Sequence, residues 1–475
     1  MIRLIVSSIR SALQHRPVQG RPYPQVAPAN PLLKNAAVFG RDPFHFMVEN
    51  QRRYGDFYDV HLPHVPLFVL SKPEYAKHVL VTNNKKYGKS FAYEFLRHPL
   101  GNGLLTSEGE FWLRQRRIAQ PAFHRERLSA LTSTISEITR EVLQEWEGYA
   151  DRQQSFNVTH DLMRLTLGIV VRTLFGSDVG QAASDIVEYI NTINQHITEK
   201  VSNPFRLPLW LPNPKNRAYE RALKGLDKVV YGIIEERRRT GKVYHDLLAM
   251  LMETEDADTG ERMNDQQIRD EVVTLFIAGT ETSAVALSWM LYLLARHPEE
   301  AHRVYEEAIQ VLSTPPRTED IAQLTRTNQV VQEAMRLYPP AWIMGREARE
   351  DDELDGYFIP RGSQVYICSY AIHRHPGLWE QPDQFRPDRF DETAAKERHK
   401  FAFFPFGGGP RYCIGNHFAM MEMQLALALI ISKFDIKLDG EAPIPVEPLI
   451  TLRPQGGVRL RLTQRSLRTP EISVR

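Results

Sequence analysis

The sequence predicts a mainly α-helical protein with a minor β region, folded as a single large domain. Residues 125–250 show helical periodicity that breaks at Gly176, at Gly180 and at the proline-rich patch 203–214. A second segment, 268–296, is apolar on nearly all sides, which is typical of a helix buried in a soluble core. The segments that favour strands are short by comparison, so helices should dominate the fold.

Length and composition are compatible with one domain. A chain of 475 residues has the length of about three average domains. The motifs that carry chemistry nevertheless lie between Trp112 and Cys413 and make sense only around one ligand, so one domain over 41–465 is predicted. With 42% hydrophobic and 25% charged residues, the chain has an ordinary soluble composition. A net charge of +1 gives no attraction to nucleic acid.

The two ends are predicted to lie outside the core. Residues 1–40 read as a proline-rich lead-in without a transmembrane anchor, because the opening apolar run is far shorter than the ~18 residues that span a bilayer. Residues 466–475 read as a loose tail. Two cysteines, Cys368 and Cys413, make no disulfide framework, which favours a reducing cytoplasm. We expect a monomer.

The minor β region is predicted from alternating apolar segments. An amphipathic helix over 44–53 precedes two strands, 57–62 and 66–70. Further strands are predicted late in the chain, at 356–362, 364–370, 436–438 and 458–462. The strand 364–370 would place Cys368 in the core.

A glycine-rich loop, 403–415, delivers Cys413 to the start of the apolar periodic segment 414–432. The positive end of a helix favours a thiolate, and the glycines 407–409 let the loop pass close to a flat ligand. The alternative is an inert cysteine, since free cysteine is among the most buried residue types. The loop pattern favours a thiolate ligand for a metal.

The loop also carries a family resemblance. Its fixed positions match the pattern F-x-x-G-x-R-x-C-x-G at Phe406, Gly409, Arg411, Cys413 and Gly415. The chain therefore resembles the cytochrome P450 superfamily, and in particular its soluble, bacterial members. The resemblance extends from about residue 44 to residue 462. The resemblance implies the P450 fold around a buried haem b, the Cys413 thiolate as its axial ligand, and O2 as co-substrate. It also places Phe406 and Gly407 against the haem.

The segment 278–283 matches the family pattern A/G-G-x-D/E-T-T/S. Small Ala278 and Gly279 are expected to let the helix approach the haem face. The Thr282 hydroxyl is expected to bond back to a helix carbonyl and to hydrogen-bond bound dioxygen, with Glu281 in the proton relay. The alternative is that Glu281 and Thr282 are ordinary residues of a helix kink. A capping box from Asn264 to Gln267 is predicted to open the helix.

Basic and acidic motifs complete the resemblance. Trp112 and Arg116 form the family's W-x-x-x-R, and the implied role of Trp112, Arg116, Arg346 and Arg411 is to hold the haem propionates. Glu333 and Arg336 form E-x-x-R on one helical face, and Arg389 is the implied third member of a structural cluster.

The resemblance also points to a substrate pocket. A loop over 91–105 is expected to roof it, and the patch 203–214, with Phe205, Leu207, Leu209 and Trp210, to act as a lid or to touch a membrane. The alternative for these aromatics is ordinary packing. The candidate pocket residues are Phe91, Leu104, Ala278, Pro340, Ala341 and Ile343.

The implied reaction is insertion of one oxygen atom of O2 into a C–H bond of a hydrophobic substrate. A fatty acid is the first expectation, followed by a terpenoid, carotenoid or steroid. Electrons would come from a separate ferredoxin or flavodoxin with an NAD(P)H-dependent reductase, docked at the basic face of Arg114, Arg117, Lys400 and Arg411.

Three alternative functions remain open at this point. A haem-thiolate isomerase or dehydratase usually lacks the acid–alcohol pair that Glu281 and Thr282 form. A peroxygenase would carry arginine and proline near that position. A non-catalytic protein would bind no haem.

Overall fold

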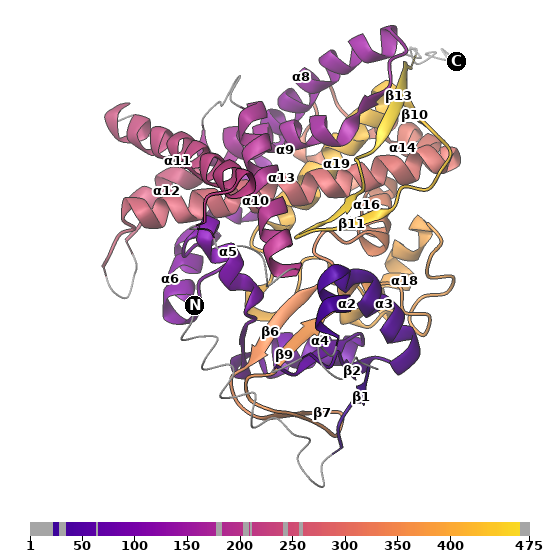
Figure 1. The fold of residues 1–475 in the computed structure, drawn as a ribbon. Helices are drawn as coiled ribbons and strands as arrows, with labels where there is room; N and C mark the ends of the chain where they lie inside the picture. Colours follow the sequence, from indigo (N-terminus) through magenta and orange to yellow (C-terminus); the bar gives the residue numbers. More distant parts are fainter. Residues whose placement is uncertain are drawn as a thin grey trace.

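The computed structural model describes residues 22–27, 35–62, 65–176, 183–202, 209, 211–240, 246–255 and 260–465. Helices fill most of this part of the chain, and in the view of Figure 1 the strands β1, β2, β6, β7 and β9 lie beneath the helical body, whereas β10, β11 and β13 lie beside the helices higher in the view. The predicted fold class, mainly α with a minor β region, is confirmed. The predicted terminal segment 466–475 and most of the predicted lid, including Phe205, Leu207 and Trp210, lie outside the described residues.

The helical body surrounds one long helix, α13 (Asp265–Arg296), which crosses the molecule and contacts α9 most extensively. The neighbouring helices of the described chain are α5 (Ala92–Leu100), α6 (Gly109–Ala119), α8 (Thr132–Asp151), α9 (Val158–Phe175), α10 (Ala183–Ser202), α11 (Pro214–Thr240), α12 (Leu247–Glu253), α14 (Pro298–Val311), α16 (Thr325–Leu337) and α19 (Asn416–Lys433). Shorter helices are α2 (Ala36–Arg41), α3 (Pro43–Tyr54), α4 (Pro73–Lys77), α7 (Arg125–Ser129), α15 (Thr318–Gln323), α17 (Ser369–Ile372) and α18 (Glu392–Glu397).

Helix α13 begins with the predicted capping box. The Asn264 side chain accepts a hydrogen bond from the Gln267 amide, and the Gln267 side chain accepts one from the Asn264 amide. Among the described helices, α13 is the one long and apolar enough to cross a membrane by length and composition, yet 83% of its most apolar window is buried inside the protein. It is therefore packed as a core helix in this structure.

The β region contains a six-stranded sheet in the order β1-β2-β3-β9-β6-β4, made of β1 (Gln25–Val26), β2 (Phe57–Asp59), β3 (Leu67–Leu70), β9 (Gln364–Ile367), β6 (Met344–Ala348) and β4 (Tyr87–Lys89). A second sheet joins β5 (Phe156–Asn157), β13 (Arg459–Gln464) and β10 (Phe434–Leu438), with Ile436 opposite Leu462. Two hairpins pair β7 (Asp352–Leu354) with β8 (Tyr357–Ile359), and β11 (Val446–Pro448) with β12 (Leu452–Pro454).

Three details differ from the sequence-based expectation. The segment 91–105, expected as a loop, contains the helix α5, because good helix formers precede Pro99 and Gly101 ends the helix with a positive φ of 60°. The strand expected to reach Tyr370 ends at Ile367, and the helix α17 begins two residues later, at Ser369. Within the segment expected as a lead-in, Gln25 and Val26 pair with β2 as an edge strand.

Candidate active site

The cysteine loop places Cys413 three residues before α19. The Cys413 amide donates to the Phe406 carbonyl at 3.0 Å, and the Tyr412 amide donates to the Gly409 carbonyl at 3.0 Å, so the loop is closed by its own backbone. Gly409 has a φ of 67°, and a Cβ added there would lie 1.8 Å from the Leu80 carbonyl oxygen. Only glycine fits this position without displacing a backbone segment.

We expect Gly409→Ala to lower the melting temperature and the haem content of the purified protein, because both the left-handed backbone and the contact with Leu80 penalise a methyl group. The matched control is Gly415→Ala, where the nearest atom to an added Cβ is a Phe123 ring carbon at 3.8 Å. Differential scanning calorimetry and haem quantification measure both effects. Equal behaviour of the two variants would contradict this account of the loop.

The Cys413 thiol lies at the wall of a cavity of about 340 Å³ that Arg116, Phe123 and His417 also line. Cys413 is exposed in the wall of this cavity. The protein atoms around the thiol desolvate it and raise its pKa, whereas the Gly415 amide and the Arg116 charge act in the opposite direction. The second cysteine, Cys368, is fully buried as predicted, and burial raises its pKa to about 12.

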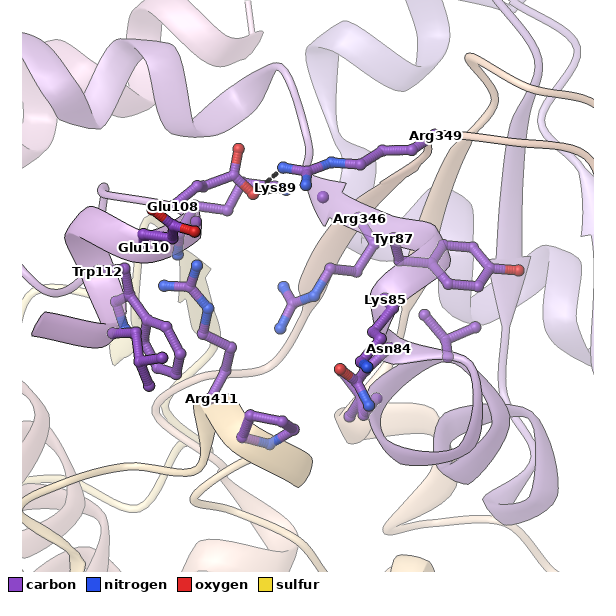
Figure 2. A pocket seen from close by; sticks show the side chains of 16 residues that line it. Asn84, Lys85, Tyr87, Lys89, Glu108, Glu110, Trp112, Arg346, Arg349 and Arg411 are labelled. Atoms are coloured by element: carbon purple, nitrogen blue, oxygen red, sulfur yellow. Dashed lines mark hydrogen bonds and ion pairs between the residues drawn. The ribbon is translucent and has the colours of Figure 1, made fainter.

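A second cavity, of about 320 Å³, brings together three of the predicted site residues, Trp112, Arg346 and Arg411 (Figure 2). The Arg411 guanidinium stacks on the Trp112 ring at 3.8 Å and donates to the Ser107 carbonyl at 2.9 Å. The Arg346 guanidinium donates to the neighbouring Gly345 carbonyl at 2.8 Å. Within the described part of the chain, neither guanidinium forms an ion pair with a carboxylate.

Arg116 lies apart from this group. Its guanidinium donates to the Tyr412 carbonyl at 2.8 Å and borders the cavity of Cys413 instead. The structure thus joins Trp112 to Arg346 and Arg411, and joins Arg116 to the cysteine loop. Arg411, which the sequence also placed on a basic docking face, is half-buried beside Trp112 in the second cavity.

Lys89 is a further basic residue of this cavity, and it was not predicted from the sequence. In the pairing of β4 with β6, Lys89 lies directly opposite Arg346, an arrangement that like charges disfavour. Burial first, and then the charges of Arg411 and Arg346, lower the pKa of Lys89 to about 6. Its ammonium also lies 4.3 Å from the Tyr93 ring centroid. The proximity of Lys89 to Arg346 becomes visible once the pairing of β4 with β6 is known.

Helix α13 presents one accessible stripe. Between Ile268 and Leu294 every residue is buried except Ala278, Gly279 and Thr282, which share one face of the helix. The Thr282 hydroxyl donates to the Ala278 carbonyl at 2.6 Å, so the predicted back-bond is confirmed.

Gly279 also has a packing role, which the sequence did not predict. A Cβ at this position would lie 2.8 Å from Val170 Cγ2 of α9, so glycine is required for the packing of α9 against α13. Its backbone nevertheless remains partly accessible beside Ala278.

Glu281 is buried, with 1% of its surface exposed, and its described partners lie on other elements. The carboxylate pairs with Arg453 at 2.6 Å and accepts hydrogen bonds from Thr451 and Asn194. The neighbouring Ser283 donates to Glu422 of α19 at 2.7 Å, and burial raises the pKa of Glu422 to about 8. The Ser283–Glu422 contact was not foreseen, because 139 residues separate the two positions.

In the predicted structural cluster Glu333 and Arg336 are fully buried and Arg389 is partly buried. Arg336 forms a two-pronged pair with Glu333, at 2.6 and 2.8 Å, and Arg389 Nε lies 3.4 Å from Glu333. Arg336 also donates to the carbonyls of His373 and Pro382, which lie upstream of the cysteine loop. The predicted contact of Arg389 with the pair is confirmed.

The predicted pocket residues differ in their contacts and in how far their side chains are buried. Leu104 donates its amide to Glu271 of α13 at 3.0 Å, which ties it to the helix of Ala278. Ile343 is half-buried at the start of β6, Ala341 is exposed and Pro340 is buried. Phe91 is 43% exposed, and its amide donates to Gln364 of the sheet, so this contact does not join it to α13.

These residues fit a haem. Its two propionate carboxylates would suit the basic side chains Lys89, Arg346 and Arg411, which outnumber the carboxylates Glu108 and Glu110 of the same cavity, and a planar guanidinium is well shaped for a carboxylate. The accessible Cys413 thiol would be the ligand of the haem iron, and the small residues of α13 would allow the haem to approach that helix. Among the described residues, no three His, Cys, Asp or Glu side chains converge on a metal site.

The sequence is similar to those of known proteins. The cytochrome P450 family profile matches residues 24–460. The chain is 33% identical to cyclooctat-9-en-7-ol 5-monooxygenase and 35% identical to cyclooctatin synthase, both from Streptomyces melanosporofaciens, over 87% and 88% of this chain and 88% and 90% of those proteins. It is 34% identical to pentalenene oxygenase of Streptomyces avermitilis, over 92% of this chain and 96% of that one. The chain therefore belongs to the cytochrome P450 family, and it is a haem-thiolate monooxygenase that uses O2, electrons from a redox partner and a hydrophobic substrate.

Proposed function

We propose that the protein hydroxylates a cyclic terpenoid. The observation that carries this proposal is the accessible stripe of α13, which is apolar except for the Thr282 hydroxyl and so offers no partner for a carboxylate substrate. The names of the three Streptomyces relatives, which concern cyclooctatin and pentalenene, support a terpenoid over the fatty acid expected first.

In this proposal Cys413 holds the haem iron, and Lys89, Arg346 and Arg411 hold the propionates with Trp112 stacked beneath Arg411. Arg116 supports the thiolate through its charge, in place of the propionate contact expected from the sequence. Phe406, Gly407 and Gly279 contact the haem plane. The bound haem supplies the activation of O2 by one-electron steps.

Thr282 and Glu281 are proposed to manage protons. The Thr282 hydroxyl lies on the accessible stripe, where it can accept a proton and pass it to a ligand, and Glu281 replaces that proton. Glu333, Arg336 and Arg389 are proposed to act only by fixing the segments beneath the cysteine loop.

The substrate is proposed to lie against Leu104, Ala278 and Ile343, with Phe91, Pro340 and Ala341 at the edge of the pocket. The reductant is proposed to be a ferredoxin or flavodoxin that docks near the exposed Arg117 and Lys400. Arg114, which pairs with Glu261, lies on the same helix as Arg117. We propose that the protein acts as a monomer in the cytoplasm.

The test is a titration of the haem-loaded protein with pentalenene and, separately, with lauric acid. Pentalenene should shift the iron from low to high spin, because an apolar ligand displaces the iron-bound water, and lauric acid should shift it less. Turnover under isotopically labelled O2 should place one labelled atom in the product. A larger shift with lauric acid would contradict the terpenoid proposal, and an unlabelled product would contradict oxygen insertion.

The matched variant is Ala278→Phe, which fills the accessible stripe without a charge change. It should abolish the pentalenene shift while leaving the carbon monoxide spectrum of the reduced protein unchanged. An unchanged pentalenene shift would remove Ala278 from the proposed pocket.

A further inference from the structure

The end of α5 and the residues that follow it are held against α13 through their backbone. Three consecutive residues of α13 each bind one backbone group of residues 99–104, which we call the strap. The contacts are those of Arg269 with the Pro99 carbonyl at 3.0 Å, Asp270 with the Asn102 amide at 2.8 Å, and Glu271 with the Leu104 amide at 3.0 Å. The strap is thus fastened to α13 at three successive points.

The strap lies directly on the face of α13 that continues into the accessible stripe. Gly103 is buried, and a Cβ added there would overlap the Thr274 hydroxyl, so the two backbones approach closely. Thr274 lies about one turn, and Glu271 about two turns, before Ala278 on the same face of the helix. Leu104 is partly accessible beside the buried Gly103. The strap therefore bounds the stripe on its N-terminal side.

Glu271 makes this contact at a cost. It is 1% exposed, its Oε2 accepts the Leu104 amide, and its Oε1 has no hydrogen-bond partner in the part of the chain that the structure describes. Burial first, and then the charge of Asp270, raise the pKa of Glu271 to about 8, while the Leu104 amide acts in the opposite direction. At pH 7 the side chain is therefore mostly a neutral acid that serves the strap as an acceptor.

The neighbouring Asp270 is compensated. Its Oδ1 pairs with Arg269 at 3.1 Å and accepts a hydrogen bond from Gln266 at 2.8 Å, while its Oδ2 accepts the Asn102 amide. A buried carboxyl group that has an oxygen without a partner lowers stability. The hydrogen bond to Leu104 is the feature of Glu271 that compensates for this loss.

We propose that Glu271 is a positioning residue that fixes the place of Leu104 and thereby the end of the substrate pocket along α13. This proposal rests on the pocket given above, in which Leu104 contacts the substrate. Because the strap is fastened through its backbone, Leu104 limits how far a ligand can extend from Ala278 towards the start of α13. The limit favours a compact ring system over a long chain.

The central test uses 1-alkylimidazoles of increasing chain length, whose ring nitrogen binds haem iron while the chain occupies the pocket. Optical titration of the haem-loaded wild-type protein should give a Kd that falls with chain length until the chain meets Leu104. The Kd should then rise by about 10-fold for the next methylene group, since a packed apolar pocket discriminates to that extent. Leu104→Ala should move this step to a longer chain, and Glu271→Leu should abolish it.

Two matched variants separate the hydrogen bond from general packing. Glu271→Gln keeps a carbonyl oxygen for the Leu104 amide, and because the acid is mostly neutral at pH 7 this variant should retain the step. Thr274→Val replaces another buried polar group on the same face with an isosteric apolar one, and it should also retain the step. Loss of the step in Thr274→Val would assign the effect to packing of α13 and overturn the positioning role.

Gly103→Ala displaces the strap while every side chain of α13 stays intact, so it provides the same test if Glu271→Leu yields no folded protein. Hydrogen exchange of the strap, measured without any pocket ligand, should be faster in Glu271→Leu than in Glu271→Gln. Equal exchange would overturn the proposal. A retained step in both Glu271→Leu and Gly103→Ala would do the same, provided that Leu104→Ala moves it. If Leu104→Ala also leaves the step in place, the proposed pocket at Leu104 fails instead.

Discussion

Replacing Cys413 with serine should abolish both the thiolate-type Soret band of the reduced, carbon monoxide-treated protein and the formation of hydroxylated product. A hydroxyl group does not donate electron density to iron as a thiolate does, so the chemistry that depends on this ligand should be lost. Absorbance spectroscopy and product analysis by mass spectrometry measure the two losses. Normal turnover with an unaltered spectrum would remove Cys413 from the haem site.

The second cysteine provides the control for this experiment. Cys368 is fully buried in the β region, packed with Phe44 and Trp342 and remote from the glycine-rich loop. Cys368→Ala should keep the Soret band and the product while lowering stability slightly, since a small buried side chain is shortened. Loss of the band in Cys368→Ala would indicate that Cys368, and not Cys413, is the haem ligand.

The Glu333→Gln substitution should destabilise the protein by about 3–5 kcal/mol, because it leaves the fully buried Arg336 without its counter-charge. This is a large part of the roughly 5–15 kcal/mol that stabilises a typical domain. We expect a marked fall in the melting temperature together with loss of haem, since Arg336 also holds the carbonyls of His373 and Pro382 upstream of the cysteine loop. Urea denaturation and haem content are the measurements.

An exposed pair of the same chemistry serves as the comparison. Glu145 and Arg164 lie 3.0 Å apart with 50% and 32% of their side chains exposed, so Glu145→Gln should cost less than about 1 kcal/mol. If the two glutamine variants were equally stable, the cluster of Glu333 would not be the structural centre that its burial indicates.

Local patterns in the sequence predicted those features that a short segment determines. The capping box at Asn264, the back-bond of Thr282 and the pairing of Glu333 with Arg336 each depend on residues three or four positions apart, and all three are confirmed. The cysteine loop was recognised for the same reason. Its glycine at 409 has a steric cause that becomes visible only beside Leu80.

Local sequence patterns could not predict contacts between residues that lie far apart in the sequence. The sequence gives no register for β4 against β6, so Lys89 was missed opposite Arg346. It also gives no sign that Arg453 and Asn194, from two distant elements, converge on Glu281. The helix α5 was expected as a loop from the resemblance of 91–105 to a pocket-roofing segment, although good helix formers precede Pro99.

The facing positions of Lys89 and Arg346 link the edge of the sheet to cofactor supply. Because the pKa of the Lys89 amine is lowered to about 6, the amine is mostly uncharged at neutral pH, and a nearby propionate carboxylate would favour its protonation. Haem uptake should therefore be accompanied by proton uptake and should stabilise the pairing of β4 with β6 by mass action. Cells that express this chain faster than they synthesise porphyrin would then accumulate a protein in which β4 is held less firmly. Amide exchange at Lys89 would report the degree of haem saturation.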